Sequence, residues 1–248
     1  MKENFKGKPF GNGSEYGFLS GEFGKEFLKE YKAVVNSDYH NNPNLSRLEF
    51  EKGVPEKCSI LRGSFYSLVL ANSLLKKEGL RIATLSDLPS ILDSNKNLIE
   101  DYSLSLGLVL RKGDSDNFYL SKLKGQAKKE GYTFSDSSPL LLNISDLEVI
   151  LDSEFPEGLR IKIGEFATPY NVPKLGENND ELYFNELDLS GFPNFLNKRE
   201  HGEKRFYSVS FHALSELILG SEGLSCTNKF YYGNSNSEYN RPIFVIKD

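Results

Sequence analysis

The amino-acid sequence predicts an α+β fold with mixed short strands, two or more helices and long irregular loops, and three local patterns carry this prediction. Apolar residues repeat at helical spacing over Ser64–Lys77, with two lysines in the last turn and Gly79 as a helix-ending residue. Leucine recurs at every second position of Ser103–Arg111, which is a strand pattern. Apolar and polar residues also alternate over Leu159–Ile163, a second strand of the same kind.

The remaining elements follow from weaker signals of the same type. Thr84 is placed to cap a helix over Leu85–Leu92, because Asp87 stands three residues later, close to a capping box. Apolar spacing predicts further helices, alternation or short apolar runs predict further strands, and polar composition predicts loops. The helices are a short one through Phe27 and Val35 to about Asn36, and one over Asn117–Gly131; the strands are Leu80–Ala83, Leu140–Ile144 and Arg205–Ala213; the loops are Asp38–Asn44 and the acidic Glu177–Glu181.

Two pairs of segments resemble each other within the chain. The decapeptide LSDLPSILDS of Leu85–Ser94 is echoed by ISDLEVILDS at Ile144–Ser153. Gly-Leu-Arg-Ile occurs at Gly79–Ile82 and again at Gly158–Ile161, but in the opposite order relative to the decapeptides. The swapped order and the lack of a third copy argue against a solenoid, so we attribute the decapeptide echo to shared helix-start chemistry.

Composition limits the class of protein. The 248 residues are long enough for a sizeable core, no linker-like stretch divides them, and we expect one domain over residues 1–248 whose first 60 residues form an N-terminal extension of unspecified packing. The net charge of −5 and the lack of a basic block exclude nucleic acid as the expected partner. No apolar run reaches the ~18 residues of a membrane span and no secretory signal is visible. The expected location is the cytoplasm, or a virion or cell surface.

Histidine and cysteine spacing gives no support to metal or catalytic chemistry. The three histidines contain no pair at i,i+3 or i,i+4, and the two cysteines form no CxxC motif. The acidic stretches Asp114–Asp116 and Glu177–Glu181 lack the Gly and Glu offsets of an EF-hand loop. We therefore expect no metal, no cofactor and no catalytic residue, with Cys58 and Cys226 as two separate buried thiols.

The C-terminal tail is the most informative segment for function. Nine of the thirteen residues of Asn228–Asn240 are Asn, Tyr or Ser, and an apolar segment, Ile243–Ile246, follows directly. Asn, Ser and Gly are ordinary loop residues, so a plain surface loop is one interpretation. Clustered Tyr and Phe beside adaptable polar residues are typical of a binding surface, however, and we expect the apolar segment to anchor such a surface.

Several segments resemble a known family. KKEGLRIATLSDL (Lys76–Leu88) resembles the helix and "GxRLPTxxEW" segment of C-type lectin domains of the formylglycine-generating-enzyme type, and Tyr239–Val245 resembles their terminal "GVRPVF" strand. Gly202–Leu217 and Gly223–Tyr232 are similar to the variable region of archaeal target proteins of diversity-generating retroelements. The resemblance implies a C-type lectin-like fold of this subtype, with residues 202–248 as the variable region and terminal strand. In that family, adenine-directed mutagenesis diversifies the variable residues.

The expected function is therefore non-enzymatic binding of a protein or other macromolecular ligand. Two other functions stay open: a virion or cell-surface component with a fixed assembly surface, and an enzyme of the formylglycine-generating type. The paired cysteines of those enzymes are not recognisable in this chain, and such an activity requires Cys226 or His212 in a pocket with a second reactive group. The expected ligand-contacting, variable residues are Ser208, Ser210, His212, Asn228, Phe230, Tyr231, Tyr232, Asn234, Asn236, Tyr239 and Asn240.

Overall fold

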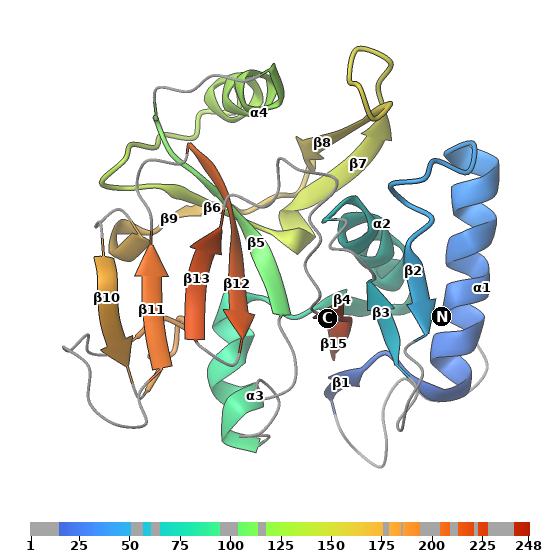
Figure 1. The fold of residues 1–248 in the computed structure, drawn as a ribbon, viewed down its shortest axis with the longest axis horizontal. Coiled ribbons are helices and arrows are strands. Elements are labelled where there is room, and N and C mark those ends of the chain that lie inside the picture. The colour runs from blue at the N-terminus through green and yellow to red at the C-terminus, as the bar shows by residue number, and fades with distance from the viewer. Residues whose placement is uncertain are drawn as a thin grey trace. The chain divides into compact units, whose positions relative to one another are not determined.

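The chain is α+β, as predicted (Figure 1). Its internal contacts divide it into two compact units, unit 1 (Met1–Ala83, Glu148–Ile161 and Gly233–Asp248) and unit 2 (Thr84–Leu147 and Lys162–Tyr232). Both units are discontinuous in the sequence, and the single domain stays a prediction. The computed structural model describes residues 15–50, 57–60, 65–94, 104–113, 118–175, 179–184, 186–193, 204–208, 213–220, 223–227 and 241–248.

Unit 1 contains two small antiparallel sheets, and the last strand of the chain is the centre of one of them. That sheet has the order β1-β15-β4, and the other has the order β14-β3-β2. Because β15 has a partner on each side, the C-terminal segment is hydrogen-bonded along both edges. The bounds are β1 (Tyr16–Phe18), β2 (Leu48–Phe50), β3 (Cys58–Ile60), β4 (Leu80–Ile82), β14 (Arg241–Pro242) and β15 (Phe244–Lys247).

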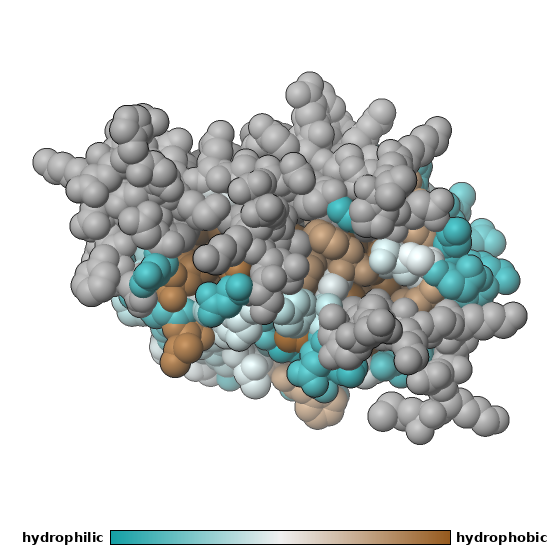
Figure 2. Space-filling view, turned by 90° about the horizontal axis from the view of Figure 1, so that it is seen from below, coloured by the Kyte–Doolittle hydropathy of each residue, from teal (hydrophilic) through white to brown (hydrophobic). Residues whose placement is uncertain are grey.

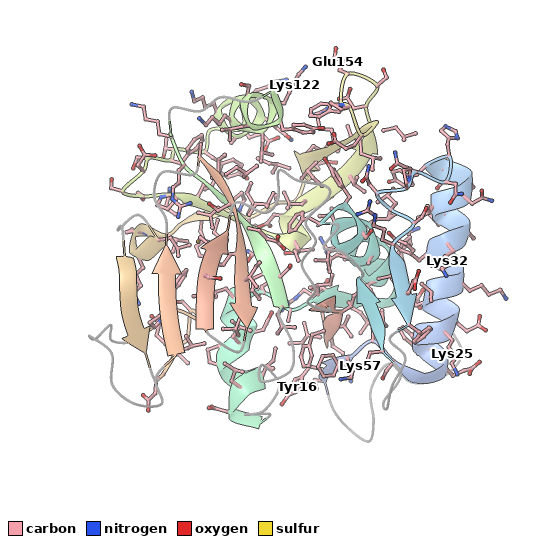
Figure 3. The ribbon with its side chains drawn as sticks, viewed as in Figure 1. Tyr16, Lys25, Lys32, Lys57, Lys122 and Glu154 are labelled. Atoms are coloured by element: carbon pink, nitrogen blue, oxygen red, sulfur yellow. The ribbon has the colours of Figure 1, made fainter. Side chains whose placement is uncertain are left out.

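Helix α1 (Gly21–Asp38) is amphipathic and begins earlier than the sequence predicts. Its core-facing residues are buried, whereas Lys25 and Lys32 are exposed and project from the helix (Figure 3). The Tyr31 hydroxyl donates a 2.8 Å hydrogen bond to the Leu45 carbonyl, which ties the helix to the loop that follows it. Residues from within the first 60 therefore contribute to the core of unit 1; those on α1 are Phe23, Phe27, Leu28, Tyr31 and Val35.

Helix α2 (Phe65–Leu75) is buried around most of its circumference and ends two residues before the predicted Lys77. A 3-10 turn, η2 (Lys76–Glu78), continues it, and Gly79 closes it in the left-handed conformation with φ of 69°. Asn72 is buried, and its Oδ1 accepts a 2.7 Å hydrogen bond from the Ile82 amide of β4. One side chain thus joins α2 to the β1-β15-β4 sheet.

Replacing Asn72 with alanine is expected to lower the free energy of unfolding by about 1–3 kcal/mol, because the Ile82 amide keeps its place in the core without an acceptor. Urea unfolding followed by far-UV circular dichroism measures the change. Ser73→Ala is the matched control on the same helix: the Ser73 hydroxyl bonds only back to the Val69 carbonyl of its own helix, at 3.1 Å, and its loss costs little. Equal losses of unfolding free energy in the two variants would show that the hydrogen bond between Asn72 and the Ile82 amide does not contribute to stability.

Unit 2 is built on a sheet that has seven strands in the described part of the chain, in the order β10-β11-β13-β12-β5-β6-β9 (Figure 1). All neighbours are antiparallel except β11 and β13, which are parallel. The bounds are β5 (Leu104–Leu110), β6 (Leu140–Asn143), β9 (Tyr170–Asn171), β10 (Asn179–Phe184), β11 (Lys204–Ser208), β12 (Leu214–Gly220) and β13 (Gly223–Thr227).

The other elements are short helices and one hairpin. In unit 2, the Gln126 side chain of α4 donates to the Ile163 carbonyl at 2.7 Å and accepts from the Ile163 amide at 2.9 Å, which fixes the end of β8. Strands β7 and β8 pair with each other. The bounds are η3 (Leu85–Asp87), α3 (Leu88–Ser94), α4 (Phe118–Lys129), η4 (Ile144–Asp146), β7 (Leu147–Leu151), β8 (Leu159–Ile163) and η5 (Pro173–Leu175).

One loop prediction is wrong. The acidic stretch Glu177–Glu181 was expected to be a loop, but Asn179–Glu181 are the first residues of β10. Strand β10 pairs antiparallel with β11, from Asn179 opposite Ser208 to Phe184 opposite Lys204. The neighbouring strand supplies backbone partners, and this tertiary pairing overrides the low strand propensity of Asn, Asp and Glu.

Candidate functional site

The predicted binding surface falls almost entirely on parts of the chain that the structure does not describe. Only the main chain of Ser208 is described: it is the last residue of β11 and is in register with Asn179 of β10. Its side chain is not described, so its contact role stays a prediction. The other expected contact residues lie outside the described residues: Ser210, His212, Asn228, Phe230, Tyr231, Tyr232, Asn234, Asn236, Tyr239 and Asn240.

The strand that precedes the tail lies inside the sheet of unit 2. Strand β13 pairs with β11 on one side and β12 on the other. Its Leu224 and Cys226 are each 1% exposed, whereas Ser225 between them is half-buried. The tail therefore begins at the end of a strand that is fixed by two ladders of hydrogen bonds and by buried side chains.

After the tail, β14 pairs with β3, and β15 pairs with β1 and β4, all in unit 1. Ile243, Phe244 and Val245 are buried. The Phe244 ring lies 5.9 Å from the ring of Tyr16 and 5.1 Å from that of Phe18, the latter edge-to-face. The apolar segment that the sequence assigns to anchor the tail thus forms a packed core strand.

A cation closes this aromatic cluster. The Lys57 ammonium stands 4.3 Å above the centre of the Phe18 ring, and Figure 3 shows Lys57 and Tyr16 in the region of β1. Lys57 is buried, and its main chain bridges to Ser20. Lys57 thus contacts a ring of β1 that itself packs edge-to-face on Phe244 of β15.

Cys226 is a packing residue in this structure. Its backbone is in register with Leu217 of β12, and both side chains are buried. A thiol buried in this way is inaccessible to a substrate. Burial of Cys226 agrees with the expectation from sequence, whereas the Cys58 side chain, on β3, is not described.

The described residues offer no metal centre. Within the ranges that the structure describes, no three His, Cys, Asp or Glu side chains gather closely enough to hold a metal ion. Over the same residues, no helix combines the length and the apolar character needed to cross a membrane.

Two buried polar pairs lie in unit 2, and no sequence pattern predicts either of them. Arg111, which is fully buried, donates from Nη1 to the Ser215 hydroxyl at 3.1 Å and from Nη2 to the Leu175 carbonyl at 3.0 Å. Ser105 donates to the buried carboxylate of Glu216. Ser105 and Glu216 connect β5 with β12, and Arg111 and Ser215 connect the residue after β5 with β12, which is a structural role for groups that are costly to bury alone.

A compact turn at Asp188–Phe192 is held by one carboxylate. Asp188 Oδ1 accepts from the amides of Ser190 at 2.9 Å and Phe192 at 3.1 Å and from the Ser190 hydroxyl, and Oδ2 accepts from Lys174 Nζ at 2.7 Å. Partial burial favours a higher pKa for Asp188, but the hydrogen bonds from Lys174, Ser190 and Phe192 outweigh it and lower the pKa from 3.8 to about 2.

The low pKa of Asp188 predicts a contribution to stability that depends on pH. Because the folded-state pKa lies below its ordinary value, the contribution is complete above about pH 4 and is lost as the pH falls towards 2. Asp188→Asn is expected to cost about 0.5–1 kcal/mol at pH 7, a small value because both charges of the Lys174 pair are partly exposed. Urea unfolding at pH 7, 4 and 2.5 should show this difference shrinking at the lowest pH.

The control for that series is Asp93→Asn, which removes a carboxylate from an exposed position of α3. It should change stability by less than about 0.5 kcal/mol at all three pH values. A constant difference between parent and Asp188→Asn from pH 7 to 2.5 would contradict the role given to the ionised Asp188.

Two large apolar side chains are almost fully exposed in unit 2. Phe166 is 90% exposed in the connection after β8, and Leu189 is 92% exposed in the Asp188–Phe192 turn. In the coloured part of the face in Figure 2, apolar residues lie at the surface beside hydrophilic ones. Single exposed apolar residues are common on protein surfaces, so neither defines a site alone.

Comparison of the chain with protein families, curated proteins and solved structures finds no match. Function must therefore be inferred from the residues of this chain.

Proposed function

We propose that the protein is a non-enzymatic binding protein whose C-terminal tail, Asn228–Asn240, displays a variable ligand-contacting surface on a C-type lectin-like scaffold. The proposed ligand is a protein or another macromolecule. Retroelement-driven diversification is part of the same proposal, and it rests on the resemblance of Gly202–Leu217 and Gly223–Tyr232 to the variable regions of such target proteins.

One observation carries the proposal: strands with buried side chains bound the tail on both sides. Leu224 and Cys226 of β13 precede it, and Ile243, Phe244 and Val245 follow it. The residues between are polar and aromatic, a composition that suits contact with a partner better than burial in a core. The strand before the tail belongs to unit 2 and the strands after it to unit 1, and each side fixes the end of the tail that adjoins it.

Separation of structural and binding positions makes such variation physically tolerable. Core residues accept little change, because interiors are close-packed and a single methylene is felt. Exposed residues mostly change stability by less than about 0.5 kcal/mol. A chain can therefore vary a tail between fixed strands without losing its fold, provided that the tail side chains do not enter the core.

The burial of Cys226 counts against the enzymatic alternative. A cysteine nucleophile needs exposure and a group that lowers its pKa. Cys226 is 1% exposed in the middle of a sheet, and its backbone partner is Leu217. The role that a formylglycine-generating activity would assign to this thiol is therefore poorly supported.

A genomic and a protein experiment test the proposal. Genes closely related to this one should differ chiefly at codons 208, 210 and 212 and within codons 228–240. A reverse transcriptase with a near-copy of the tail DNA that differs only at adenines should lie nearby. Tails that are identical among such genes would favour the fixed assembly surface instead.

The protein experiment asks whether the tail aromatics are needed for folding. The triple variant Tyr231→Ser, Tyr232→Ser and Tyr239→Ser should unfold within about 2 °C of the parent, because exposed substitutions are nearly neutral. A drop of 10 °C or more in Tm, an effect on the order of 3 kcal/mol, would place these side chains in the core and contradict the proposal.

A further inference from the structure

Unit 2 displays large apolar side chains on two turns whose backbones are fixed. Within the described residues of unit 2, the large apolar side chains that face solvent are Phe166, Tyr170 and Leu189, at 90%, 37% and 92% exposure. Tyr170 lies on β9, which ends the seven-stranded sheet in the described part of the chain (Figure 1). Turns usually carry Gly, Asn, Asp or Ser, so large apolar side chains on two turns are unusual.

Three hydrogen bonds fix the backbone around Phe166. The Gly164 amide donates to the Asp146 carbonyl at 2.8 Å, and the Ala167 amide donates to the Gly164 carbonyl at 3.3 Å. The Thr168 amide donates to the Asp146 carboxylate at 2.9 Å. Asp146 is itself buried, so the turn that carries Phe166 is attached to the interior of unit 2.

The turn that carries Leu189 is fixed in the same manner. Asp188 closes it through its side chain, and the Gly191 amide adds a 2.8 Å bond to the Asp188 carbonyl. Gly191 packs so closely on η3 that a Cβ at this position would overlap the Leu85 carbonyl. Because both turns are fixed before a partner arrives, binding costs little conformational entropy at these positions.

Tyr170 lies near the elements that hold both turns. Its pKa is raised to about 12, first by burial and then by the negative charges of Asp146 and Asp87. Asp146 holds the turn of Phe166, and Asp87 ends η3, on which Gly191 packs. Since both carboxylates act on Tyr170, the three exposed side chains belong to one region of unit 2.

Acidic side chains flank the exposed apolar ones. Glu165 precedes Phe166, Glu186 stands three positions before Leu189, and both glutamates are exposed. The cation beside the second turn, Lys174, is compensated, since its Nζ lies 2.7 Å from the carboxylate that closes the turn. The region therefore presents apolar anchors beside negative charge.

We infer that Phe166, Tyr170 and Leu189 form a docking surface for a protein partner whose contacting segment is apolar and basic. The inference goes beyond the proposed function and does not involve the C-terminal tail. Covering the apolar side chains removes them from water, and Lys or Arg of the partner opposite Glu165 and Glu186 adds charge complementarity. A second copy of the chain would bring the same acidic side chains to this place, so it is repelled.

Peptide selection on the full-length protein tests this surface. A phage-displayed library of random peptides is enriched on the parent and depleted on the double variant Phe166→Ser and Leu189→Ser, which keeps the tail. The selected peptides should combine large apolar residues with Lys or Arg. By fluorescence anisotropy, each should bind the double variant at least about tenfold more weakly than the parent.

Two further variants control the experiment. Leu151→Ser removes a side chain that is 45% exposed on β7, in unit 1, and should leave Kd within about twofold. Glu165→Lys with Glu186→Lys leaves the apolar residues in place and should weaken the same peptides by at least about threefold. The Tm of every variant should stay within about 2 °C of the parent, because all the changed residues are exposed.

The inference is overturned if no peptide is selected, if acidic peptides dominate, or if parent and double variant bind equally. Sedimentation of the parent as a dimer, with the double variant as a monomer, would assign the surface to a second copy and overturn the basic partner.

Discussion

Replacing Gly107 with alanine is expected to lower the free energy of unfolding by at least about 3 kcal/mol, the upper end of the range for overpacking. Gly107 lies on β5, opposite Asn143 of β6 and Leu217 of β12. A Cβ added there would stand closer than 3.0 Å to the Leu142 carbonyl oxygen and 3.0 Å from the Asn143 Cα. Both are backbone atoms of a paired strand, so the clash can be relieved only by separating β5 from β6.

The control for this variant is Gly125→Ala on α4. Apart from its chain neighbours and the backbone of its own helix, no atom lies within 4 Å of the position that its Cβ would take. Alanine in a helix is favoured over glycine by about 0.5–1 kcal/mol, so this change should be neutral or stabilising. Urea unfolding should therefore show a large loss of stability for Gly107→Ala and no loss, or a gain, for Gly125→Ala. A Gly107→Ala protein as stable as the parent would contradict the close approach of β5 and β6 at Gly107.

The behaviour of β5 shows where sequence periodicity stops being informative. Alternating leucines predict a strand, and the strand is confirmed. All seven of its residues are buried, however, including Ser105, Gly107 and Val109. The alternation of leucines reflects only the residue types of this strand. Whether its second face is buried depends on segments that lie far away in the sequence.

The two similar decapeptides show that a capping box can be predicted from sequence, but that it does not determine which element follows it. Thr84 with Asp87, and Asn143 with Asp146, each form a capping box with a 3-10 turn, so the shared helix-start chemistry is confirmed. The first copy then continues as α3, with Pro89 in the first turn, where its missing amide costs little. The second continues as β7, with Val149 inside the strand.

The Gly-Leu-Arg-Ile copies agree with each other more closely. Gly79 and Gly158 both have left-handed backbones, with φ of 69° and 68°, and each is followed by a strand, β4 or β8. Glycine is favoured there because positive φ is strained for residues with a Cβ. A local conformational requirement of this kind is visible in sequence, whereas the partners of the two strands are not.

The polar pairs in the sheet of unit 2 were beyond sequence reasoning for a related reason. Arg111 and Ser215 are 104 positions apart, and Ser105 and Glu216 are 111 apart. No local spacing connects such residues. Pairing of β5 with β12 brings them together, and this pairing is a property of the topology rather than of either segment.

The second large effect is expected on β15, where Phe244→Ala should cost about 3–5 kcal/mol, the usual range for truncating a buried Phe. Phe244 is 3% exposed and its ring contacts those of Tyr16 and Phe18. Its carbonyl accepts from the Ala83 amide at 3.1 Å, a backbone bond that alanine keeps. The loss therefore measures side-chain packing, and hydrogen exchange should become faster in β1, whose partner is β15.

Lys247→Ala is the control on the same strand, since Lys247 is exposed and its main chain keeps its pairing with Leu80. It should change stability by less than about 0.5 kcal/mol. A tail that depends on β15 for its fixed end should lose ligand binding in Phe244→Ala before the protein is fully unfolded, and keep it in Lys247→Ala. If Phe244→Ala left stability unchanged, Phe244 would not be an anchor of β15, and the support for the proposed binding surface would be lost.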